Sequence, residues 1–247
     1  MSTSVIPRKS LRPSLGAPRL VVPERRSHVA AWLRRASLWL RLRARDFSPR
    51  VRRAIDVLVA GSALVLLAPI FLIVAIAQQI DDRGPVFFAQ ERIGAGGKRF
   101  RMWKLRTMIA DADAMKTALA AAQKASTDGV RFKLRVDPRV TRVGRVMRKL
   151  SIDELPQLWN VLRGDMTLIG PRPAVWREVA LYDARALRRL EVPQGLTCLW
   201  QVGGRSDLSF EQQVELDLTY IDTTTPKDEL KIALKTIPAV LGGKGAY

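Results

Sequence analysis

The sequence predicts a mainly α-helical protein with a few short strands, of the α+β class, that is attached to a membrane through one proline-interrupted apolar helix. Three observations support this prediction. Residues 57–77 carry no charge, residues 84–108 form two short extended runs around glycines, and much of the remaining chain has helix-start signals or apolar residues at helical spacing. With 247 residues, 47% of them hydrophobic, the chain is long enough for one sizeable core or two small ones.

The first 53 residues carry most of the formal net charge of +19, because Glu24 and Asp46 are their only acids. Such a charge favours polyanionic partners: nucleic acid, anionic lipid or phosphorylated substrates. Residues 1–26 mix Pro, Ser, Arg and Gly without an apolar period, and we expect a disordered basic tail. Residues 27–50 predict a basic amphipathic juxtamembrane helix suited to an anionic membrane surface, although the solvated face of a soluble helix has the same pattern.

Residues 51–80 are predicted to form a membrane helix, because their uncharged part reaches the ~20 residues needed to cross a hydrocarbon core. Pro69 donates no backbone hydrogen bond and biases Ala68 away from helical angles, so we expect it to divide the apolar run. A kinked span and a re-entrant hairpin both satisfy this pattern. Basic residues on both sides of the segment favour the cytoplasm for both ends. Re-entry therefore predicts a cytoplasmic domain of residues 81–247.

A carboxylate lies near the start of the membrane segment. Asp56 follows Arg52 by four residues and Arg53 by three. Side chains at these spacings are neighbours on a helix surface. We therefore expect Asp56 to be paired with an arginine on the surface of the helix.

Two predictions concern the chain after the membrane segment. Residues 84–108 predict two short strands joined by a turn at Gly94–Gly97. The alternative for these glycines is a phosphate cradle, but the GK[ST] ending of a P-loop is missing and no helix follows at once. Residues 111–125 have high helix propensity and predict a helix.

Three further predictions concern the C-terminal region. Ser209–Gln212 form a capping box that opens a helix ending near Ile221, and Thr225–Pro226 open another helix. The apolar residues that share one face of this last helix are Leu230, Ala233, Leu234, Ile237 and Leu241. Cys198 and Trp200 are expected to pack in the core.

The chain contains a single histidine, His28, and a single cysteine, Cys198. Ser-His-Asp triads, thiol–imidazole pairs and Cys/His zinc clusters need residues that the chain lacks. His28 is also far in sequence from the acidic pair at residues 153–154, so it is assigned no catalytic role. Any chemistry therefore depends on carboxylates, hydroxyls, lysine or arginine.

Residues 139–173 hold the densest set of charged side chains, with the adjacent acids Asp153 and Glu154 between basic residues. By pattern alone, Ser151 as N-cap and Glu154 at the third helical position form a capping box, which is a structural role. The alternative is phosphate chemistry, in which an ionised aspartate attacks phosphorus to give an acyl phosphate and Mg²⁺ neutralises the anionic approach. Both interpretations remain open at this level.

Four motifs resemble those of the bacterial sugar transferase family, the monotopic phosphoglycosyl transferases. In chain order they are GPVFFAQERIGAGGKRFRMWKLRTM, DPRVTRVGRVMRK, SIDELPQLWNVLRGDMTLIGPRP and WQVGGRSDLSFEQQVELDLTYI. The resemblance runs from about Arg52 to the C-terminus. The chain departs from the family pattern where many members have Ser-Pro instead of Ala68-Pro69, and Ser-Gly or Asn-Gly instead of Gly203-Gly204.

The resemblance implies an enzyme that transfers a sugar-1-phosphate from a UDP-sugar to undecaprenyl phosphate and releases UMP, as the first membrane step of polysaccharide or glycoconjugate assembly. The donor sugar is expected to be a hexose such as glucose or galactose. The implied location is the bacterial inner membrane, with a helix that re-enters at Pro69 and a catalytic domain of residues 81–247 in the cytoplasm. We expect membrane lipids as partners and no binding to nucleic acid. The sequence does not decide whether the protein also forms a homo-oligomer or binds downstream glycosyltransferases.

The resemblance also implies roles for individual residues. Asp153 would be the catalytic nucleophile that forms a covalent phosphosugar intermediate, and Glu154 would be its catalytic partner. Both carboxylates would lie at the expected cofactor, Mg²⁺, as its ligands. The residues implied to bind substrate are Arg148, Arg172, Arg205 and Lys104.

Overall fold

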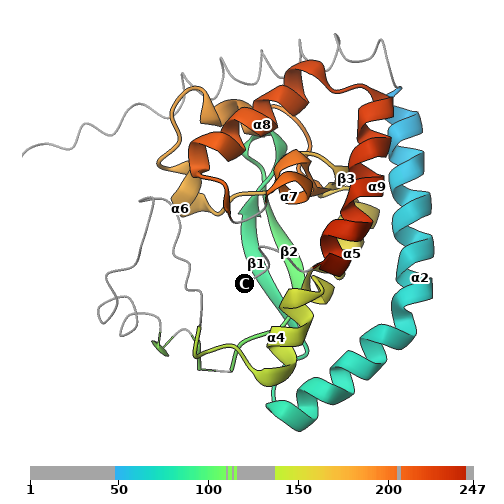
Figure 1. Cartoon of the computed structure of the whole chain (residues 1–247), viewed down its shortest axis with the longest axis vertical. Coiled ribbons are helices and arrows are strands. Elements are labelled where there is room, and N and C mark those ends of the chain that lie inside the picture. The colour runs from blue at the N-terminus through green and yellow to red at the C-terminus, as the bar shows by residue number, and fades with distance from the viewer. Residues whose placement is uncertain (1–47, 110, 113, 116–136, 205–206, 243–247) are drawn as a thin grey trace, which may run out of the picture.

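The computed structural model describes residues 48–109, 111–112, 114–115, 137–204 and 207–242 (Figure 1). The helices are α2 (Pro49–Asp81), α4 (Arg142–Lys149), α5 (Gln157–Arg163), α6 (Trp176–Val179), α7 (Leu199–Gly203), α8 (Phe210–Thr223) and α9 (Pro226–Gly242). The 3₁₀ turns are η1 (Ala95–Gly97), η2 (Ile152–Glu154) and η3 (Ala186–Leu190), and the strands are β1 (Phe87–Ile93), β2 (Arg99–Leu105), β3 (Thr167–Ile169) and β4 (Gly195–Thr197). This composition confirms a mainly helical protein with a few short strands.

Several predictions fall outside the described residues. They are the basic tail 1–26, nearly all of the juxtamembrane helix 27–50, and most of the helix predicted at 111–125. His28 and Arg205 also lie outside the described ranges. These statements stay predictions.

The helix α2 carries the whole apolar segment. It begins at Pro49, where a proline suits the first helical turn, and continues through Pro69 to Asp81. Pro69 divides the apolar run without ending the helix, because a long helix accommodates a proline by bending, as the kinked alternative expects. The ribbon of α2 indeed changes direction part-way along its length (Figure 1). Within the described ranges, α2 is the one helix long and apolar enough to cross a membrane.

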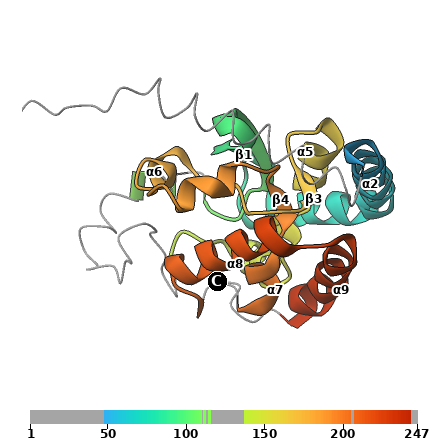
Figure 2. The same ribbon diagram turned by 90° about the horizontal axis from the view of Figure 1, so that it is seen from above.

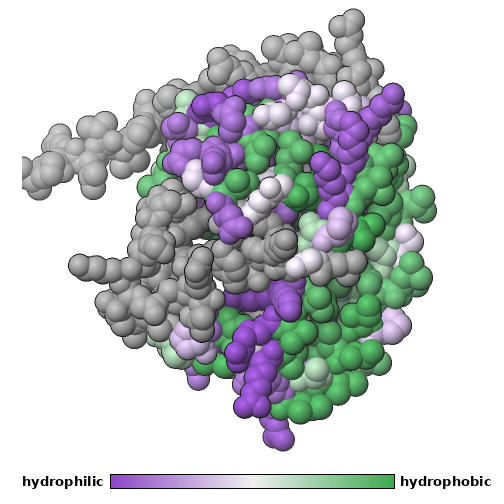
Figure 3. Space-filling view, viewed as in Figure 1, coloured by the Kyte–Doolittle hydropathy of each residue, from purple (hydrophilic) through white to green (hydrophobic). Residues whose placement is uncertain are grey.

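Much of the surface of α2 is apolar and exposed. Val65, Leu66 and Ile80 are 75%, 77% and 82% exposed. Figure 3 shows hydrophobic residues gathered along the edge of the molecule where α2 lies. Soluble monomers rarely expose a contiguous apolar surface of this kind, so α2 indicates membrane association.

The other face of α2 packs against the domain along both halves of the helix. In the first half, Ala60 is fully buried and packs with Leu158 and Val161 of α5. In the second half, Val74 packs with Leu105 at the end of β2. Contact along the whole helix keeps the domain beside the apolar surface.

The first turns of α2 also make polar contacts with the domain. Asp56 is 6% exposed and accepts hydrogen bonds from Thr167 Oγ1 at 2.8 Å and from Leu168 N at 3.1 Å. The expectation that Asp56 is paired with Arg52 or Arg53 on the helix surface is therefore wrong. Both arginines donate instead to backbone carbonyls of the domain. Burial of this end of the helix explains the difference, because buried polar groups must find partners across the interface.

The predicted hairpin is confirmed. Strands β1 and β2 pair antiparallel with Phe87 opposite Leu105, and the turn lies at η1. Gly96 and Gly97 have φ values of 71° and 74°, a conformation that favours glycine. The glycines therefore form a turn between strands.

A second small sheet pairs β3 with β4 in parallel, with Thr167 opposite Gly195. Gly170 and Gly195 lie so close together that a Cβ on either one would overlap the backbone of the other strand or its flanking residues. This sheet brings the chain before Arg172 next to the chain before Cys198. No pattern in the sequence predicts this sheet.

The C-terminal helices agree with prediction. Ser209 opens α8 with a capping box, and Pro226 is the first residue of α9. The main apolar core lies between α8, α9 and the strands, and Cys198 and Trp200 are buried as expected. Seen from above, α2 and α5 lie on one side of β3 and β4, and α7, α8 and α9 lie on the other (Figure 2).

Candidate active site

Arg148 is placed by α4 and by the chain that leaves β2. Thr141 caps α4 by accepting a hydrogen bond from Gly144 N at 2.9 Å. Gly144 contacts Thr107 so closely that a Cβ would overlap the Thr107 carbonyl oxygen. Arg148 Nε then donates to Thr107 Oγ1 at 3.0 Å. Burial lowers the pKa of Arg148, and the negative charge of Asp153 opposes this shift. The Arg148 guanidinium and the Asp153 carboxylate are therefore close enough to interact electrostatically.

Ser151 leads into the acidic pair in an unexpected conformation. Its φ of 54° and ψ of 22° are left-handed, and its side chain makes no cap hydrogen bond. The expected capping box of Ser151 and Glu154 is therefore wrong, because an N-cap residue needs an extended backbone to reach the amides that follow. The left-handed turn is followed by η2 rather than by a regular α-helix, and Asp153 of η2 is buried.

Glu154 is held as an anion by two cations. Lys104 Nζ of β2 lies 3.1 Å from Glu154 Oε1, and Arg172 Nη1 donates to Glu154 Oε2 at 3.1 Å. Burial alone would raise the pKa of Glu154, but Arg172 and Lys104 together hold it well below its usual range. The same ion pair raises the pKa of Arg172. Glu154 therefore fixes the positions of a lysine and an arginine that come from distant parts of the chain.

Asp153 has a different environment. Asp153 itself is 8% exposed, and among the described residues the nearest cation to its carboxylate, Lys104 Nζ, is 3.8 Å away. Burial raises the pKa of Asp153, Lys104 lowers it, and the adjacent Glu154 raises it again. A buried carboxylate with one long ion pair is poorly stabilised as an anion. A new bond to phosphorus or a bound cation would neutralise the charge of such a carboxylate and so stabilise it.

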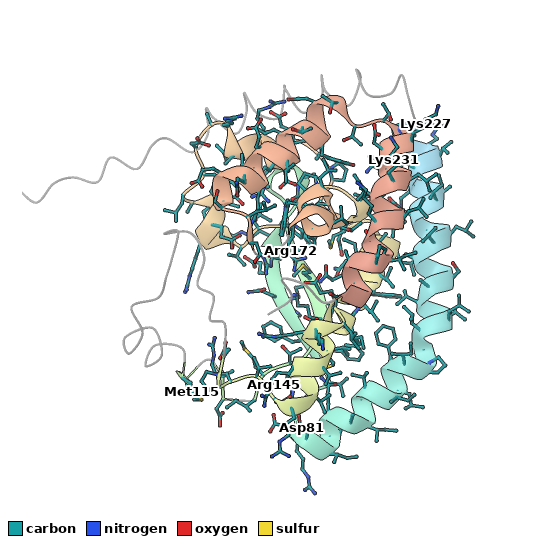
Figure 4. The ribbon with its side chains drawn as sticks, in the orientation of Figure 1. Asp81, Met115, Arg145, Arg172, Lys227 and Lys231 are labelled. Atoms are coloured by element: carbon teal, nitrogen blue, oxygen red, sulfur yellow. The ribbon has the colours of Figure 1, made fainter. Side chains whose placement is uncertain are left out.

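The structure brings five of the six predicted site residues together. Lys104 comes from β2, Arg148 from α4, Asp153 and Glu154 from η2, and Arg172 from the chain after β3. In Figure 4, Arg172 lies in the middle of the molecule, below α7 and above Arg145 of α4. Three cations around a poorly paired carboxylate suit the binding of phosphate beside a nucleophile.

Comparison with known proteins decides the family. The family model described as bacterial sugar transferase matches residues 47–243 of this chain. The chain belongs to the bacterial sugar transferase family. It is 43% identical over 198 residues to the exopolysaccharide production protein ExoY of Sinorhizobium fredii, which covers 79% of this chain and 88% of that relative.

Two further relatives of this sugar transferase have names that describe their reactions. The UDP-glucose:undecaprenyl-phosphate glucose-1-phosphate transferase of Caulobacter vibrioides is 41% identical over 79% of this chain and 72% of its own length. The undecaprenyl-phosphate galactose phosphotransferase of Salmonella typhimurium is 37% identical over 83% of this chain and 43% of its own length. The present sugar transferase is accordingly a phosphoglycosyl transferase.

Mg²⁺ is the cofactor expected for this sugar transferase, and the acidic pair supplies carboxylate oxygens of the kind that the ion binds. Mg²⁺ is usually held by one or two carboxylates together with substrate phosphates. The Glu154 oxygens already accept from two cations, so the Asp153 carboxylate offers the freer oxygens. No group of three or more acidic, histidine or cysteine side chains able to hold a metal occurs among the described residues. Substrate phosphates would therefore complete the coordination.

Two residues that no sequence pattern singled out support the site. Thr107 orients Arg148, as described above. Asn160 of α5 is fully buried, accepts from Trp103 N at 3.0 Å and donates to Arg101 O at 2.7 Å. It thereby fixes β2, and with it Lys104, against the helix that follows the acidic pair. A lone asparagine within the helix LPQLWNVL was the available signal, since such a residue needs buried partners.

Proposed function

We propose that this sugar transferase moves a hexose-1-phosphate from a UDP-hexose to undecaprenyl phosphate, releases UMP, and thereby begins exopolysaccharide assembly. The observation that carries the proposal is the environment of Asp153: a buried, poorly paired carboxylate beside Lys104, Arg148 and Arg172. The names of the relatives supply the substrate class. The donor is proposed to carry glucose or galactose.

In the first proposed step, an Asp153 oxygen attacks the phosphorus that bears the sugar. A bond forms between this oxygen and phosphorus, and the bond from phosphorus to the oxygen bridging to UMP breaks, so UMP leaves with the electron pair. The product is an acyl phosphate that joins the phosphosugar to Asp153. Arg148 and Arg172 stabilise the charge on the phosphate oxygens, which is the main requirement of phosphoryl transfer.

In the second proposed step, an oxygen of undecaprenyl phosphate attacks the same phosphorus. The bond between phosphorus and the Asp153 oxygen breaks, which regenerates the carboxylate and forms the lipid diphosphate sugar. One phosphoanhydride replaces another, so the reaction needs no ATP. Glu154 is a weak base because its pKa is held low. Its proposed part in both steps is to hold Lys104 and Arg172 in place.

Mg²⁺ is proposed to bind at the acidic pair, held mainly by Asp153 because the Glu154 oxygens already accept from Lys104 and Arg172. When bound, the ion supplies charge neutralisation for the diphosphate of the donor. Lys104 and Arg172 would supply the remaining positive charge. Because the ion would meet the diphosphate directly, transfer is expected to fall steeply after chelation by EDTA and to return when Mg²⁺ is added.

The proposed location is the inner membrane, with α2 re-entering the bilayer and the domain in the cytoplasm. Two observations support this arrangement. The apolar surface of α2 is continuous and exposed, and the domain packs against both halves of the helix rather than one. A helix that crossed the bilayer at full length would separate one of its halves from the domain.

The test measures UMP release from UDP-glucose and UDP-galactose with undecaprenyl phosphate and Mg²⁺. The wild-type protein is expected to release UMP with one of these donors, and Asp153→Asn is expected to lose at least about 10³-fold because the nucleophile is gone. Asp222→Asn is the matched control, because Asp222 is an exposed carboxylate in a surface ion pair with Arg188. Equal rates for Asp153→Asn and wild type would contradict the proposed function.

A further inference from the structure

The first turns of α2 bind three successive residues of β3. Thr167 Oγ1 and Leu168 N both donate to the Asp56 carboxylate, at 2.8 and 3.1 Å. The carbonyl oxygen of the third residue, Ile169, accepts from Arg52 Nη2 at 2.6 Å. Asp56 is 6% exposed, so this carboxylate has little access to water that would replace its partners. The membrane helix therefore fixes the whole of β3 by side-chain hydrogen bonds.

A second set of contacts keeps Arg52 in position. Its Nη2 donates to Tyr220 Oη at 2.7 Å and lies 3.1 Å from Glu229 Oε1. Tyr220 Oη in turn lies 2.9 Å from Ile169 O. The contacts join α2, α8, α9 and the end of β3 at one point.

The chain from β3 to Arg172 has little freedom to move independently. Gly170 N donates to Thr197 O at 3.0 Å, and Pro171 O accepts from Gly195 N at 2.9 Å. The close approach of Gly170 and Gly195 leaves no room for a shift toward β4. Arg172 follows directly and donates to Glu154. A displacement of β3 is therefore passed on to Arg172 and to its ion pair.

We propose that Asp56 is a positioning residue for phosphosugar transfer: by holding β3 against the membrane helix, it sets the place of Arg172 beside Glu154 and Asp153. This inference rests on the proposed function. It gives the membrane helix a part in forming the active site as well as in anchoring it. Burying a carboxylate is costly unless it is hydrogen-bonded, and the two hydrogen bonds from β3 offset this cost for Asp56.

The test is a double-mutant cycle on Asp56 and Arg172 with steady-state UMP release. Asp56→Ala is expected to lower kcat on the order of 10- to 100-fold with a smaller change in KM, because misplacement of a substrate-orienting group costs rate. Arg172→Lys alone lowers kcat as well. Since Asp56 acts through Arg172, the double variant should be no slower than the slower single variant. Asp56→Asn should recover most of the rate, because its amide still accepts from Leu168 N and can donate to Thr167.

Asp81→Ala is the matched control. Asp81 is a carboxylate at the other end of α2, and its Oδ2 accepts from Val143 N of α4 at 2.8 Å. Figure 4 shows Asp81 at the opposite end of α2 from Lys227 and Lys231 of α9. Because Asp81 touches neither β3 nor Arg172, its effect should multiply with that of Arg172→Lys.

Hydrogen exchange tests the same geometry without any substrate. In Asp56→Ala the backbone amides of residues 167–170 and of Arg172 should exchange faster, whereas Asp81→Ala should leave them unchanged. If Asp56→Ala does not fold, Thr167→Val removes one of the same hydrogen bonds and takes its place. Independent, multiplying effects of Asp56→Ala and Arg172→Lys, or unchanged exchange at these amides, would overturn the inference. Absence of UMP release from the wild type would instead contradict the proposed function, and the exchange result would still decide the inference.

Discussion

Asp153 and Glu154 are adjacent in the chain, yet their carboxylates have opposite electrostatic environments. Lys104 and Arg172 hold the pKa of Glu154 well below its usual range. Burial raises the pKa of Asp153, and its ion pair with Lys104 is longer, at 3.8 Å. Such a difference between two adjacent carboxylates supports the proposed division between a residue that organises the site and a residue that reacts.

The first prediction concerns the stability cost of Asp153. Because its pKa is raised on folding, the folded protein binds this proton more readily than the unfolded chain, and stability falls as the pH rises through the folded-state pKa. Asp153→Asn removes this cost, so it should raise the unfolding midpoint at pH 7.5. The gain should vanish below the ordinary pKa of 3.8, where the carboxyl is protonated in both states. A thermal unfolding series between pH 3 and 8 in detergent measures this, and a lower midpoint for Asp153→Asn at pH 7.5 would contradict it.

The second prediction concerns Glu154. Glu154→Ala leaves Arg172 and Lys104 without their shared carboxylate. The side chains of Lys104, Glu154 and Arg172 are 19%, 21% and 18% exposed. The loss of unfolding free energy should therefore lie between the ~0–1 kcal/mol of a surface ion pair and the ~3–5 kcal/mol of a fully buried one. Denaturant unfolding of the variant should show this loss. Glu91→Ala is the control, since Glu91 forms an ion pair with Arg99 in which both side chains are more than half exposed. Equal losses of unfolding free energy in Glu154→Ala and Glu91→Ala would contradict the claim that Glu154 holds Lys104 and Arg172 in place.

Residue identity at the site was predictable from sequence to a considerable extent. The family motifs contain Lys104, Arg148 and Arg172, and the structure places all three at the acidic pair. The conformation of Ser151 was not predictable, because the pattern of a capping box does not reveal the backbone angles that a capping box needs. The partners of Asp56 were equally hidden, since helical spacing describes neighbours on one helix and not contacts with a distant strand.

At the scale of elements, close backbone contacts place the catalytic side chains. Gly144 allows α4 to touch the chain after β2, and Gly170 and Gly195 allow β3 to touch β4. Each contact lies within four residues of Arg148 or Arg172. Small residues at these points therefore set the distance between the cations and the acidic pair.

The third prediction tests this at Gly144. Alanine normally favours a helix over glycine by about 1 kcal/mol, yet a Cβ at Gly144 would overlap the Thr107 carbonyl oxygen. Gly144→Ala should therefore destabilise the protein and lower UMP release by at least about 10-fold, since α4 carries Arg148. Gly203→Ala in α7 is the control, because a Cβ there meets nothing within 4 Å. A stabilised, fully active Gly144→Ala variant would show that the close contact is not needed.

Elements with strong local signals were predicted well. The hairpin has glycines at its turn and the helix α8 has a full capping box, so local chemistry determines them. The strands β3 and β4 have three residues each and pair in parallel across a long separation. No periodic pattern can develop over three residues, so this sheet depends on tertiary packing that sequence patterns do not contain.

In the molecule as a whole, the apolar surface of α2 and the active site are held together by packing of the domain against α2. The helix α2 exposes its apolar residues outward and packs the domain inward along both of its halves. A lipid phosphate that stays at the headgroup level can then meet Asp153 while its hydrocarbon chain stays in the bilayer.

The fourth prediction tests how α2 sits in the membrane. Cys198 is buried, so a cysteine placed at Ser48 or at Arg83 offers a selective site on either side of α2. With re-entry, a membrane-impermeant maleimide should label neither position in intact spheroplasts and both after permeabilisation. Labelling of Arg83→Cys but not Ser48→Cys in intact spheroplasts would show that α2 spans the membrane.

The central claim is that Asp153 forms a covalent bond to the phosphosugar, and trapping that intermediate tests it most directly. The protein is incubated with Mg²⁺ and the UDP-hexose that supports turnover, carrying ³²P at the phosphate attached to the sugar, without undecaprenyl phosphate. We expect radiolabelled protein, release of about one UMP per labelled enzyme, a labelled peptide containing Asp153, and loss of the label when undecaprenyl phosphate is added. Turnover without any labelled protein, or labelling that persists in Asp153→Asn, would contradict it.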